Sequence, residues 1–258
     1  GRHRRRLLGA PLVSEDGQVI IGDIGAVACL AAGTGEVRWE LAGPGSPDTL
    51  LTYGTGLVSG ELAVLPFGGP GVGLTALTLA GGGVAWTDPA GTPPPSCSLV
   101  PAGDGDALVV RTATPSLERF ELATGRLRWR TALPGRYSTA PPLLTRDGIV
   151  LVTGDGIVVW LDPATGTITG DYQLTGLRDG HGPYRAAGPG APTAPVPAGR
   201  DPVVVLVDGS AWRLRPDGAE LAGDAGAPVT TQPAALGPDT LAVLTTGAVL
   251  CFLDLAGQ

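Results

Sequence analysis

The sequence predicts an all-β domain of 258 residues built from six copies of one four-stranded repeat. A turn motif recurs about every 43 residues, a spacing typical of architectures made from supersecondary repeats. Between the turns stand apolar runs of four to eight residues rich in Val, Ile and Leu, as expected for short strands. With 42 Gly and 25 Pro, the chain also has enough turn-forming residues to connect many strands.

The clearest copies of the turn motif end in Trp. Residues 31–39 are repeated as residues 122–129, and a third copy at 162–168 keeps the turn but has Gly170 where Trp would fall. Weaker copies are found at 80–86, 215–221 and 255–257. The turn glycines of the six copies, at intervals of 39 to 52 residues, are Gly35, Gly82, Gly125, Gly166, Gly218 and Gly257. Six units therefore fill the chain.

Each unit has the pattern of a strand meander. In the fourth unit a Gly-containing turn at 154–156 separates two apolar runs, 149–152 and 157–161. The first unit repeats this order with runs at 19–21 and 26–30. Glycine at such turns permits the positive φ angles that tight hairpins require. Each unit is therefore predicted to be a four-stranded antiparallel sheet.

The succession of a buried strand, a Gly/Asp turn, a second strand, an Ala-Thr-Gly turn and a strand carrying Trp resembles the quinoprotein-type (PQQ-like) repeat family. The resemblance covers nearly the whole chain and is most specific in the first, third and fourth units. It implies a six-bladed β-propeller in which the Ala-Thr-Gly turn joins the two outer strands of a blade. It also implies that Trp39, Trp86 and Trp129 pack between neighbouring blades.

The N-terminal residues are predicted to close the propeller. Residues 4–8 precede Pro11 as residues 128–131 precede Pro141, and the last unit stops just after its turn. We expect the N-terminal strand, residues 4–8, to complete the last blade, because this would remove the exposed strand edges of an open array. The chain 1–258 is then a single PQQ-like β-propeller domain of six four-stranded antiparallel blades.

Composition and charge exclude several function classes. All 17 basic residues are Arg and the net charge is −7, so the chain has no general basic field for nucleic acid. The sequence has no apolar run of about 18 residues, so it predicts no membrane span. Cys29, Cys97 and Cys251 are odd in number and widely spaced, which argues against a disulfide framework or a Cys-x-x-Cys metal site. They indicate reduced thiols and a cytoplasmic location, with export or the cell surface as the alternative.

Candidate ligand-binding residues lie in the loops that lead from an outer strand to the next inner strand. Long loops with charged and aromatic groups often carry function. Guanidinium groups pair with carboxylate or phosphate, and aromatic rings stack on planar ligands. The set predicted to bind an anionic or planar ligand at the channel face is Arg136, Tyr137, Arg178, His181, Tyr184 and Arg185. The alternative is a solvated loop. No metal site is predicted, because His3 is the only imidazole in the sequence besides His181.

Catalytic and cofactor motifs are sparse, and we expect no catalytic residues and no cofactor. The quinoprotein dehydrogenases that the repeat resembles hold PQQ and calcium with carboxylates and amides, and typically carry an adjacent Cys pair. This sequence has no Asn and no two adjacent Cys, so it departs from that pattern at the residues that bind the cofactor. The absence of Lys also removes Schiff-base and phosphate-loop chemistry.

Three functional hypotheses follow. The first is a non-catalytic propeller that serves as the sensor or regulatory domain of a larger bacterial protein, such as a Ser/Thr kinase. It would bind a small molecule or peptide, or contact a fused or separate partner protein. The second is an exported protein-assembly scaffold resembling the outer-membrane assembly propellers of the family. The third is a small-molecule enzyme with Tyr184 or His181 as general base at the channel mouth. The fold alone does not decide among them.

Overall fold

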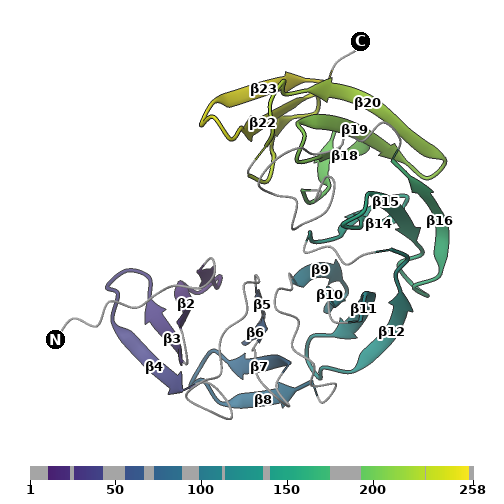
Figure 1. Cartoon of the computed structure of the whole chain (residues 1–258). Coiled ribbons are helices and arrows are strands. Elements are labelled where there is room, and N and C mark those ends of the chain that lie inside the picture. Colours follow the sequence, from purple (N-terminus) through teal and green to yellow (C-terminus); the bar gives the residue numbers. More distant parts are fainter. Residues whose placement is uncertain are drawn as a thin grey trace. The chain divides into compact units, whose positions relative to one another are not determined.

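The computed structural model describes residues 11–23, 26–42, 56–66, 73–88, 99–111, 114–135, 140–174, 193–229 and 231–255. These residues form six antiparallel sheets and no helix, so none of them belongs to a helix able to cross a membrane (Figure 1). The predicted all-β fold of six repeated sheets is confirmed. Ring closure stays a prediction, because the expected closing strand, residues 4–8, lies outside the described residues.

The chain divides into two compact units, and each is described by itself. The first unit comprises residues 1–114 and 118–130, and the second comprises residues 115–117 and 131–258. We call each sheet a blade and number the blades in chain order. The assignment of the whole chain to one domain stays a prediction.

The first unit contains blades 1 and 2 and most of blade 3. Their strands are β1 (Leu12–Val13), β2 (Gln18–Asp23), β3 (Ala26–Ala31) and β4 (Val37–Ala42); β5 (Leu57–Ser59), β6 (Leu62–Pro66), β7 (Leu74–Thr78) and β8 (Val84–Thr87); and β9 (Leu99–Gly103), β10 (Asp106–Arg111), β11 (Ser116–Glu121) and β12 (Leu127–Ala132). In each blade the strands lie side by side in sequence order. The first strands β1, β5 and β9 approach one another, so β4, β8 and β12 are the outer edges.

The second unit contains blades 4, 5 and 6. Their strands are β13 (Leu143–Thr145), β14 (Gly148–Val152), β15 (Ile157–Leu161) and β16 (Ile168–Gln173); β17 (Val196–Ala198), β18 (Asp201–Val205), β19 (Ser210–Arg215) and β20 (Gly218–Asp224); and β21 (Ala234–Gly237), β22 (Thr240–Leu244) and β23 (Leu250–Asp254). Again the first strands β13, β17 and β21 are neighbours. Within the described residues blade 6 has three strands, and β23 pairs with β22 alone.

The turn before the outer strand requires Gly in the first four blades. The φ angles of Gly35, Gly82, Gly125 and Gly166 lie between +70° and +72°, where a side chain is strained. Each glycine amide donates to the carbonyl oxygen four residues earlier, at 2.7 or 2.8 Å. The recurring motif that predicted the repeat is therefore a backbone requirement.

Blade 5 departs from this turn. The sequence copy at 215–221 is a two-residue hairpin in which Arg215 pairs directly with Gly218. The last copy of the motif, with Gly257, lies outside the described residues. The six copies recognised in the sequence thus include at least two kinds of turn.

Trp side chains connect the blades of the first unit. The indole N–H of Trp39 on β4 donates to the carbonyl oxygen of Leu79 in blade 2 at 2.7 Å, and that of Trp86 on β8 donates to Leu122 in blade 3 at 2.9 Å. The ring of Trp39 lies against the turn of blade 2, because a Cβ on Gly82 would come within 2.6 Å of the indole. Packing between blades is confirmed for these two Trp residues. For Trp129, which is half-buried on β12, it stays a prediction.

Blade 4 uses Tyr172 where blades 1 and 2 use Trp. Gly170 occupies the Trp position of the repeat, and a Cβ there would lie 3.2 Å from Pro216 O. Two residues later on β16, the Tyr172 hydroxyl lies 2.9 Å from Arg215 O and 2.8 Å from Gly218 O, both in blade 5. The contact between the two blades is therefore kept by a different side chain.

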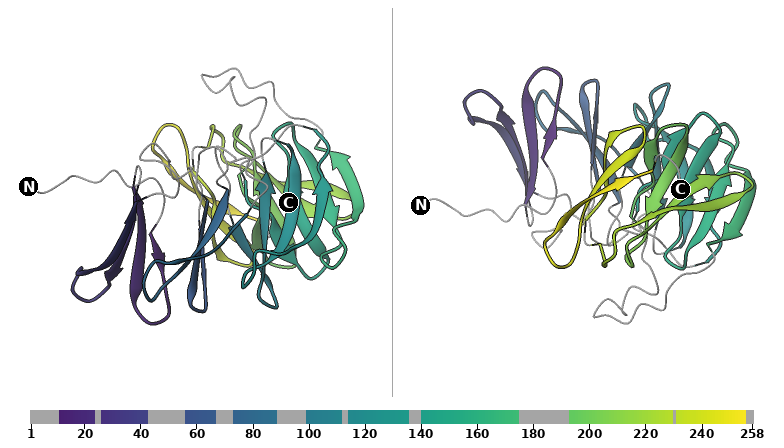
Figure 2. Two further views of the ribbon diagram at one scale, coloured as in Figure 1. Left: turned by 90° about the horizontal axis from the view of Figure 1, so that it is seen from below. Right: turned by 90° about the horizontal axis from the view of Figure 1, so that it is seen from above.

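The hydrophobic cores lie between successive blades. In the first unit, Ile20 and Val27 of blade 1 pack with Leu65 and Leu77 of blade 2. A second core joins blades 2 and 3, and in the second unit similar cores join blades 4 and 5 and blades 5 and 6. Figure 2 shows the sheets of these blades from two further sides. Both faces of an inner blade are thus buried, which explains the continuous apolar runs of the second and third strands.

Candidate functional site

None of the six predicted ligand-binding residues lies among the described residues. Arg136 and Tyr137 belong to the stretch 136–139, and Arg178, His181, Tyr184 and Arg185 belong to the stretch 175–192. Cys97 also lies outside the described residues. The two stretches do connect an outer strand to the first strand of the next blade, β12 to β13 and β16 to β17, as predicted. The binding set itself stays a prediction.

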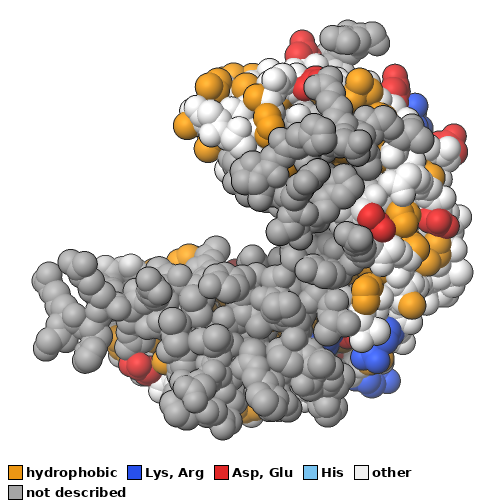
Figure 3. All heavy atoms as spheres, viewed as in Figure 1, with side chains coloured by type: hydrophobic (Ala, Val, Ile, Leu, Met, Phe, Trp, Pro, Cys, Tyr) orange, Lys and Arg blue, Asp and Glu red, His pale blue; other side chains and the backbone are white. Residues whose placement is uncertain are grey.

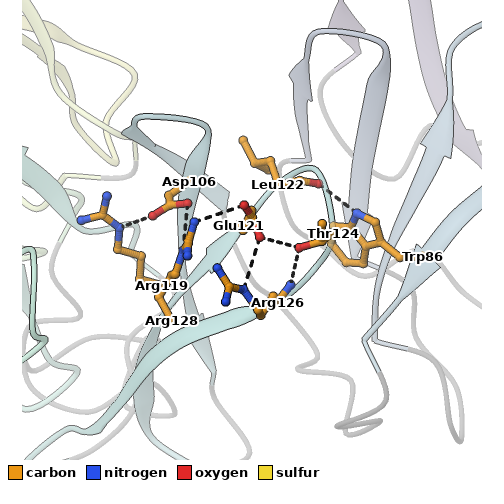
Figure 4. A network of polar contacts seen from close by, with 8 residues as sticks. All are labelled: Trp86, Asp106, Arg119, Glu121, Leu122, Thr124, Arg126 and Arg128. Atoms are coloured by element: carbon orange, nitrogen blue, oxygen red, sulfur yellow. Dashed lines mark hydrogen bonds and ion pairs between the residues drawn. The ribbon is translucent and has the colours of Figure 1, made fainter.

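An exposed cluster of charged side chains lies on blade 3. We call it the arginine cluster, and it comprises Asp106, Arg119, Glu121, Arg126 and Arg128 (Figure 4). Asp106 lies 2.8 Å from Arg119 Nε and 3.5 Å from Arg128 Nε. Glu121 lies 3.2 Å from a terminal nitrogen of Arg128 and 3.4 Å from Arg126 Nε. Two carboxylates therefore hold three guanidinium groups on neighbouring strands and their connecting turn.

The turn of blade 3 positions Glu121 for this role. The Thr124 hydroxyl donates to Glu121 Oε2 at 2.7 Å, and the Arg126 amide donates to the same hydroxyl at 3.2 Å. The hydrogen bond from Thr124 lowers the pKa of Glu121, and the charges of Arg128 and Arg126 lower it further. Glu121 is thus kept ionised by the same turn that the sequence motif marks.

The arginine cluster presents cationic groups to solvent. The side chains of Arg126 and Arg128 are 65% and 36% exposed. Figure 3 shows Arg side chains in blue gathered over β12, in a chain whose net charge is −7. A guanidinium group has five N–H donors, so each of these Arg residues can bind an external carboxylate while it keeps its internal partner. The cluster is suited to contact an acidic surface.

A second ionic network joins blades 2 and 3 and is largely buried. Arg111 on β10 donates to Asp88, which follows β8, and to Glu118 on β11, at 3.0 Å for the latter. Arg130 Nε lies 2.6 Å from the other oxygen of Glu118. Burial would lower the pKa of Arg111, but Glu118 and Asp88 outweigh it and raise the pKa. These groups line a cavity of about 240 Å³ beside Trp86. Since the charges satisfy one another, we interpret the network as structural.

A larger hollow of about 760 Å³ lies between blades 1 and 2. Glu15, Asp16 and Glu61 line it with three carboxylates, yet the described residues contain no group of acidic, His or Cys side chains able to hold a metal. Hydrogen bonds from Ser14 and Gln18 lower the pKa of Asp16. The hollow is therefore acidic and open, without a built ion site.

The described thiols are free. Cys29 is buried on β3 and donates to the Gln18 side-chain oxygen at 3.1 Å, and Cys251 is half-buried on β23. Burial raises the pKa of Cys29. A protonated thiol in this position serves as a hydrogen-bond donor inside blade 1 and is a poor nucleophile.

The repeats and their turns match a known family. The family profile described as "Outer membrane protein assembly factor BamB" matches residues 2–99 and 74–258 of this chain. The chain belongs to this family of PQQ-like repeat proteins. The resemblance inferred from the Thr-Gly turns and their Trp residues is thereby confirmed.

Individual relatives agree with this assignment. The outer membrane protein assembly factor BamB of Burkholderia pseudomallei is 28% identical over an aligned length of 250 residues, and the alignment covers 81% of this chain. The chain spans 64% of the length of that curated relative.

Solved structures share the fold. A crystal structure of BamB from Moraxella catarrhalis superimposes with a TM-score of 0.56 at 16% identity, over 97% of this chain and 86% of that one. The computationally designed Ika8 protein gives a TM-score of 0.69 at 13% identity, over 98% of this chain and 72% of that one. These likenesses support the blade architecture alone.

Sequence reasoning missed the arginine cluster. A partial signal for it exists, because Arg126 in the turn and Arg128 on β12 alternate, while Glu121 ends the strand before them. Alternate residues of a strand share a face, so this pattern places cations opposite carboxylates. Recognising the cluster required knowing that β12 is the outer strand of its blade.

Proposed function

We propose that this chain is a protein-binding scaffold in a bacterial protein-assembly machinery. The observation that carries the proposal is the match to the family described as an outer membrane protein assembly factor, which extends over nearly the whole chain. It favours the assembly-scaffold hypothesis over the sensor hypothesis, since the curated relative carries the same description. Binding of partner proteins is then the activity to be tested.

The described residues support such a role. Cores between blades and the hydrogen bonds of Trp39 and Trp86 connect the neighbouring blades of the first unit. The arginine cluster adds exposed guanidinium groups that Asp106 and Glu121 already hold in place. Arg is favoured at protein interfaces, and a pre-ordered side chain loses little entropy on binding. We therefore propose an acidic segment of a partner protein as the ligand of the arginine cluster.

The test is co-purification of the tagged chain from its source bacterium after chemical crosslinking, with partners quantified by mass spectrometry. We expect a small number of proteins at a fixed ratio to the chain. The double variant Arg126→Ser/Arg128→Ser should lower the yield of these partners by roughly tenfold, because the loss of one important interface contact weakens binding by about that factor. Arg146→Ser is the matched control, because Arg146 is similarly exposed and, among the residues that the structure describes, pairs with its neighbour Asp147. Equal yields from all three proteins would reject the cluster as the contact.

The sensor hypothesis depends on Arg178 and Tyr184, which lie outside the described residues. A thermal-shift and mass-spectrometric screen for bound metabolites, repeated on Arg178→Ala and Tyr184→Ala, tests it separately. A metabolite that binds the chain and is lost in both variants would support a small-molecule sensor. Cell fractionation addresses the location: a scaffold of the cell envelope is expected outside the cytoplasm, whereas the free thiols favoured the cytoplasm.

A further inference from the structure

Blade 2 has an outer strand without charged residues. β8 is the edge of its sheet, and none of the described strands pairs with it on its open side (Figure 1). The outer strands of the other four-stranded blades all carry charges within their bounds: Arg38 and Glu40 on β4, Arg128 and Arg130 on β12, Asp171 on β16, and Glu220 and Asp224 on β20. Charged side chains on an edge strand protect it from pairing with another chain. β8 lacks this protection.

The open side of β8 presents backbone hydrogen-bonding groups. The amide of Asp88 donates to the carbonyl oxygen of Leu74 at 2.8 Å, so the backbone groups of Asp88 and, two residues earlier, of Trp86 point to β7. Those of Ala85 and Thr87 alternate with them and point to the open side. Both of these residues are exposed. A strand that adds to this edge therefore finds donors and acceptors in the right direction.

The cavity of about 240 Å³ beside Trp86 lies next to this strand, and all of its lining residues belong to the first compact unit. Its apolar walls are Leu74 and Trp86 of blade 2 and Phe120 and Leu127 of blade 3. Leu127 is 45% exposed and Trp86 is half-buried, so the cavity opens to solvent beside the outer strands. It is smaller than the roughly 300–1,000 Å³ typical of small-molecule sites, which suits it to a single side chain.

The mouth of this cavity is cationic. Four charged groups line it, and three of them, Asp88, Arg111 and Glu118, bond to one another with side chains that are 16%, 10% and 4% exposed. The side chain of the fourth, Arg130, is 49% exposed, although its Nε lies 2.6 Å from Glu118. A guanidinium group has five N–H donors, so Arg130 can also bind an external carboxylate. The cavity therefore favours an apolar side chain with a carboxylate nearby.

An added strand can present both groups to the cavity. Side chains of a strand alternate between its two faces, so residues two positions apart point the same way. An apolar side chain and a carboxylate at this spacing would both lie on the face of blade 2 that carries Trp86. Strand addition of this kind takes its affinity from main-chain hydrogen bonds and its specificity from pockets for alternate side chains. The edge of β8 and the cavity beside it provide these two components.

We propose that β8 binds an extended segment of a partner protein as an additional strand. An apolar side chain of this segment fills the cavity beside Trp86, and an acidic residue two positions away pairs with Arg130. Charge complementarity selects this occupant, because the exposed guanidinium group of Arg130 attracts a carboxylate and repels a basic segment. The proposal rests on the proposed role of the chain as a protein-binding scaffold and specifies the kind of segment bound. It does not depend on the arginine cluster.

Fluorescence anisotropy of a labelled peptide, Thr-Glu-Thr-Phe-Thr-Glu-Thr, titrated with the whole chain tests the proposal. A Glu stands two positions from Phe on each side, so either strand direction brings one of them to Arg130. We expect saturable binding that weakens about tenfold or more when Ser replaces Phe, because no ring is then buried in the cavity. No binding of the first peptide, or equal binding of both, would overturn the proposal.

Two variants test the edge and the cation separately. Thr87→Pro removes a backbone donor on the open side of β8 and should weaken peptide binding about tenfold or more. Glu40→Pro is the matched control, because Glu40 follows Trp39 on β4 as Thr87 follows Trp86 on β8. The wild-type chain should prefer the Glu peptide over a Gln peptide by about two- to fivefold, and Arg130→Gln should remove this preference.

Circular dichroism checks that the variants are folded. If Thr87→Pro does not fold, the comparison of Glu and Gln peptides on the Arg130→Gln chain decides. Equal effects of Thr87→Pro and Glu40→Pro would show that β8 is not the docking edge. A preference for Glu that persists in the Arg130→Gln chain would equally overturn the proposal.

Co-purification distinguishes this proposal from the scaffold role itself. We expect the Thr87→Pro and Arg130→Gln chains to lose at least one partner that the Glu40→Pro chain keeps. Full retention of every partner by all three variants would overturn docking at β8 and leave the scaffold role intact, whereas a wild-type chain without partners would reject both. Sedimentation velocity checks for a second copy as the occupant: self-association that Thr87→Pro removes would also overturn the proposal.

Discussion

Gly35 and Gly82 hold the same turn position with φ angles of +70° and +71°, yet their surroundings differ. A Cβ on Gly35 would meet nothing within 4 Å, whereas a Cβ on Gly82 would lie 2.6 Å from the indole of Trp39. Both positions require a left-handed backbone, but only Gly82 also makes room for the neighbouring blade. Glycine is therefore favoured at this motif position for two separate physical reasons, the backbone angle and the space for the neighbouring indole.

Replacing each glycine with Ala should distinguish the cost of backbone strain from the cost of displacing the indole. Gly35→Ala should lower the free energy of unfolding by about 1–2 kcal/mol, the strain of a left-handed residue with a side chain. Gly82→Ala should lower it by about 2–4 kcal/mol, because the added methyl group also displaces Trp39. Urea unfolding monitored by Trp fluorescence measures both. Equal losses would show that the indole adapts without cost.

Glu121 gives a pH-dependent prediction at the same scale. Its folded-state pKa lies below the ordinary value of 4.5, with the hydrogen bond from Thr124 as the largest cause. Since the folded pKa is lower than the unfolded one, the carboxylate stabilises the fold above about pH 4.5, and this stabilisation is lost as pH falls through the folded pKa. Thr124→Ala should move the pKa of Glu121 back toward its ordinary value. An NMR titration of the side-chain carboxyl carbon checks this, and an unchanged pKa would contradict it.

Strands of different blades are joined by charge as well as by apolar packing. Arg111 on β10 is held by Glu118 of its own blade and by Asp88 of the blade before it, and its side chain is 10% exposed. Removal of one partner from a buried ionic network leaves the others without compensation. β8, β10 and β11 therefore depend on one guanidinium group.

Arg111→Met should lower the free energy of unfolding by about 3–5 kcal/mol, because Asp88 and Glu118 lose their shared cation in a buried site. Arg146→Met is the control, since the exposed pair of Arg146 with Asp147 should contribute less than about 1 kcal/mol. Chemical denaturation at neutral pH compares the two variants. Similar small losses would mean that water reaches the network.

The whole molecule combines a net charge of −7 with a cationic patch, the arginine cluster on blade 3. Salt screens exposed charges. Partner binding through the arginine cluster should therefore depend on ionic strength.

Raising the salt concentration should weaken partner binding through the arginine cluster severalfold. Co-purification yield at low and high NaCl measures the effect, with the Arg146→Ser chain as the reference. A yield that does not change with salt would show that exposed charge does not hold the partner.

Local chemistry explains why the fold was predictable. The Gly of a Thr-Gly turn indicates a left-handed backbone angle, and apolar runs bounded by Gly and Asp indicate short strands. Six repeats and the PQQ-like family could therefore be recognised from the sequence. The packing of Trp39 and Trp86 followed from the same repeat. The six loop residues predicted to bind a ligand stay a prediction, because no repeat determines the structure of a loop.

What the sequence determined by itself is the repeat: its period, its turns and the apolar strands between them, all of which depend on residues close together in the chain. Tertiary structure decided which distant groups meet. Tyr172 takes the contact that Gly170 cannot make, and Arg111 reaches Asp88 in another blade. These differences arise because a side chain's environment is set by the neighbouring blade, which lies about forty residues away in the sequence.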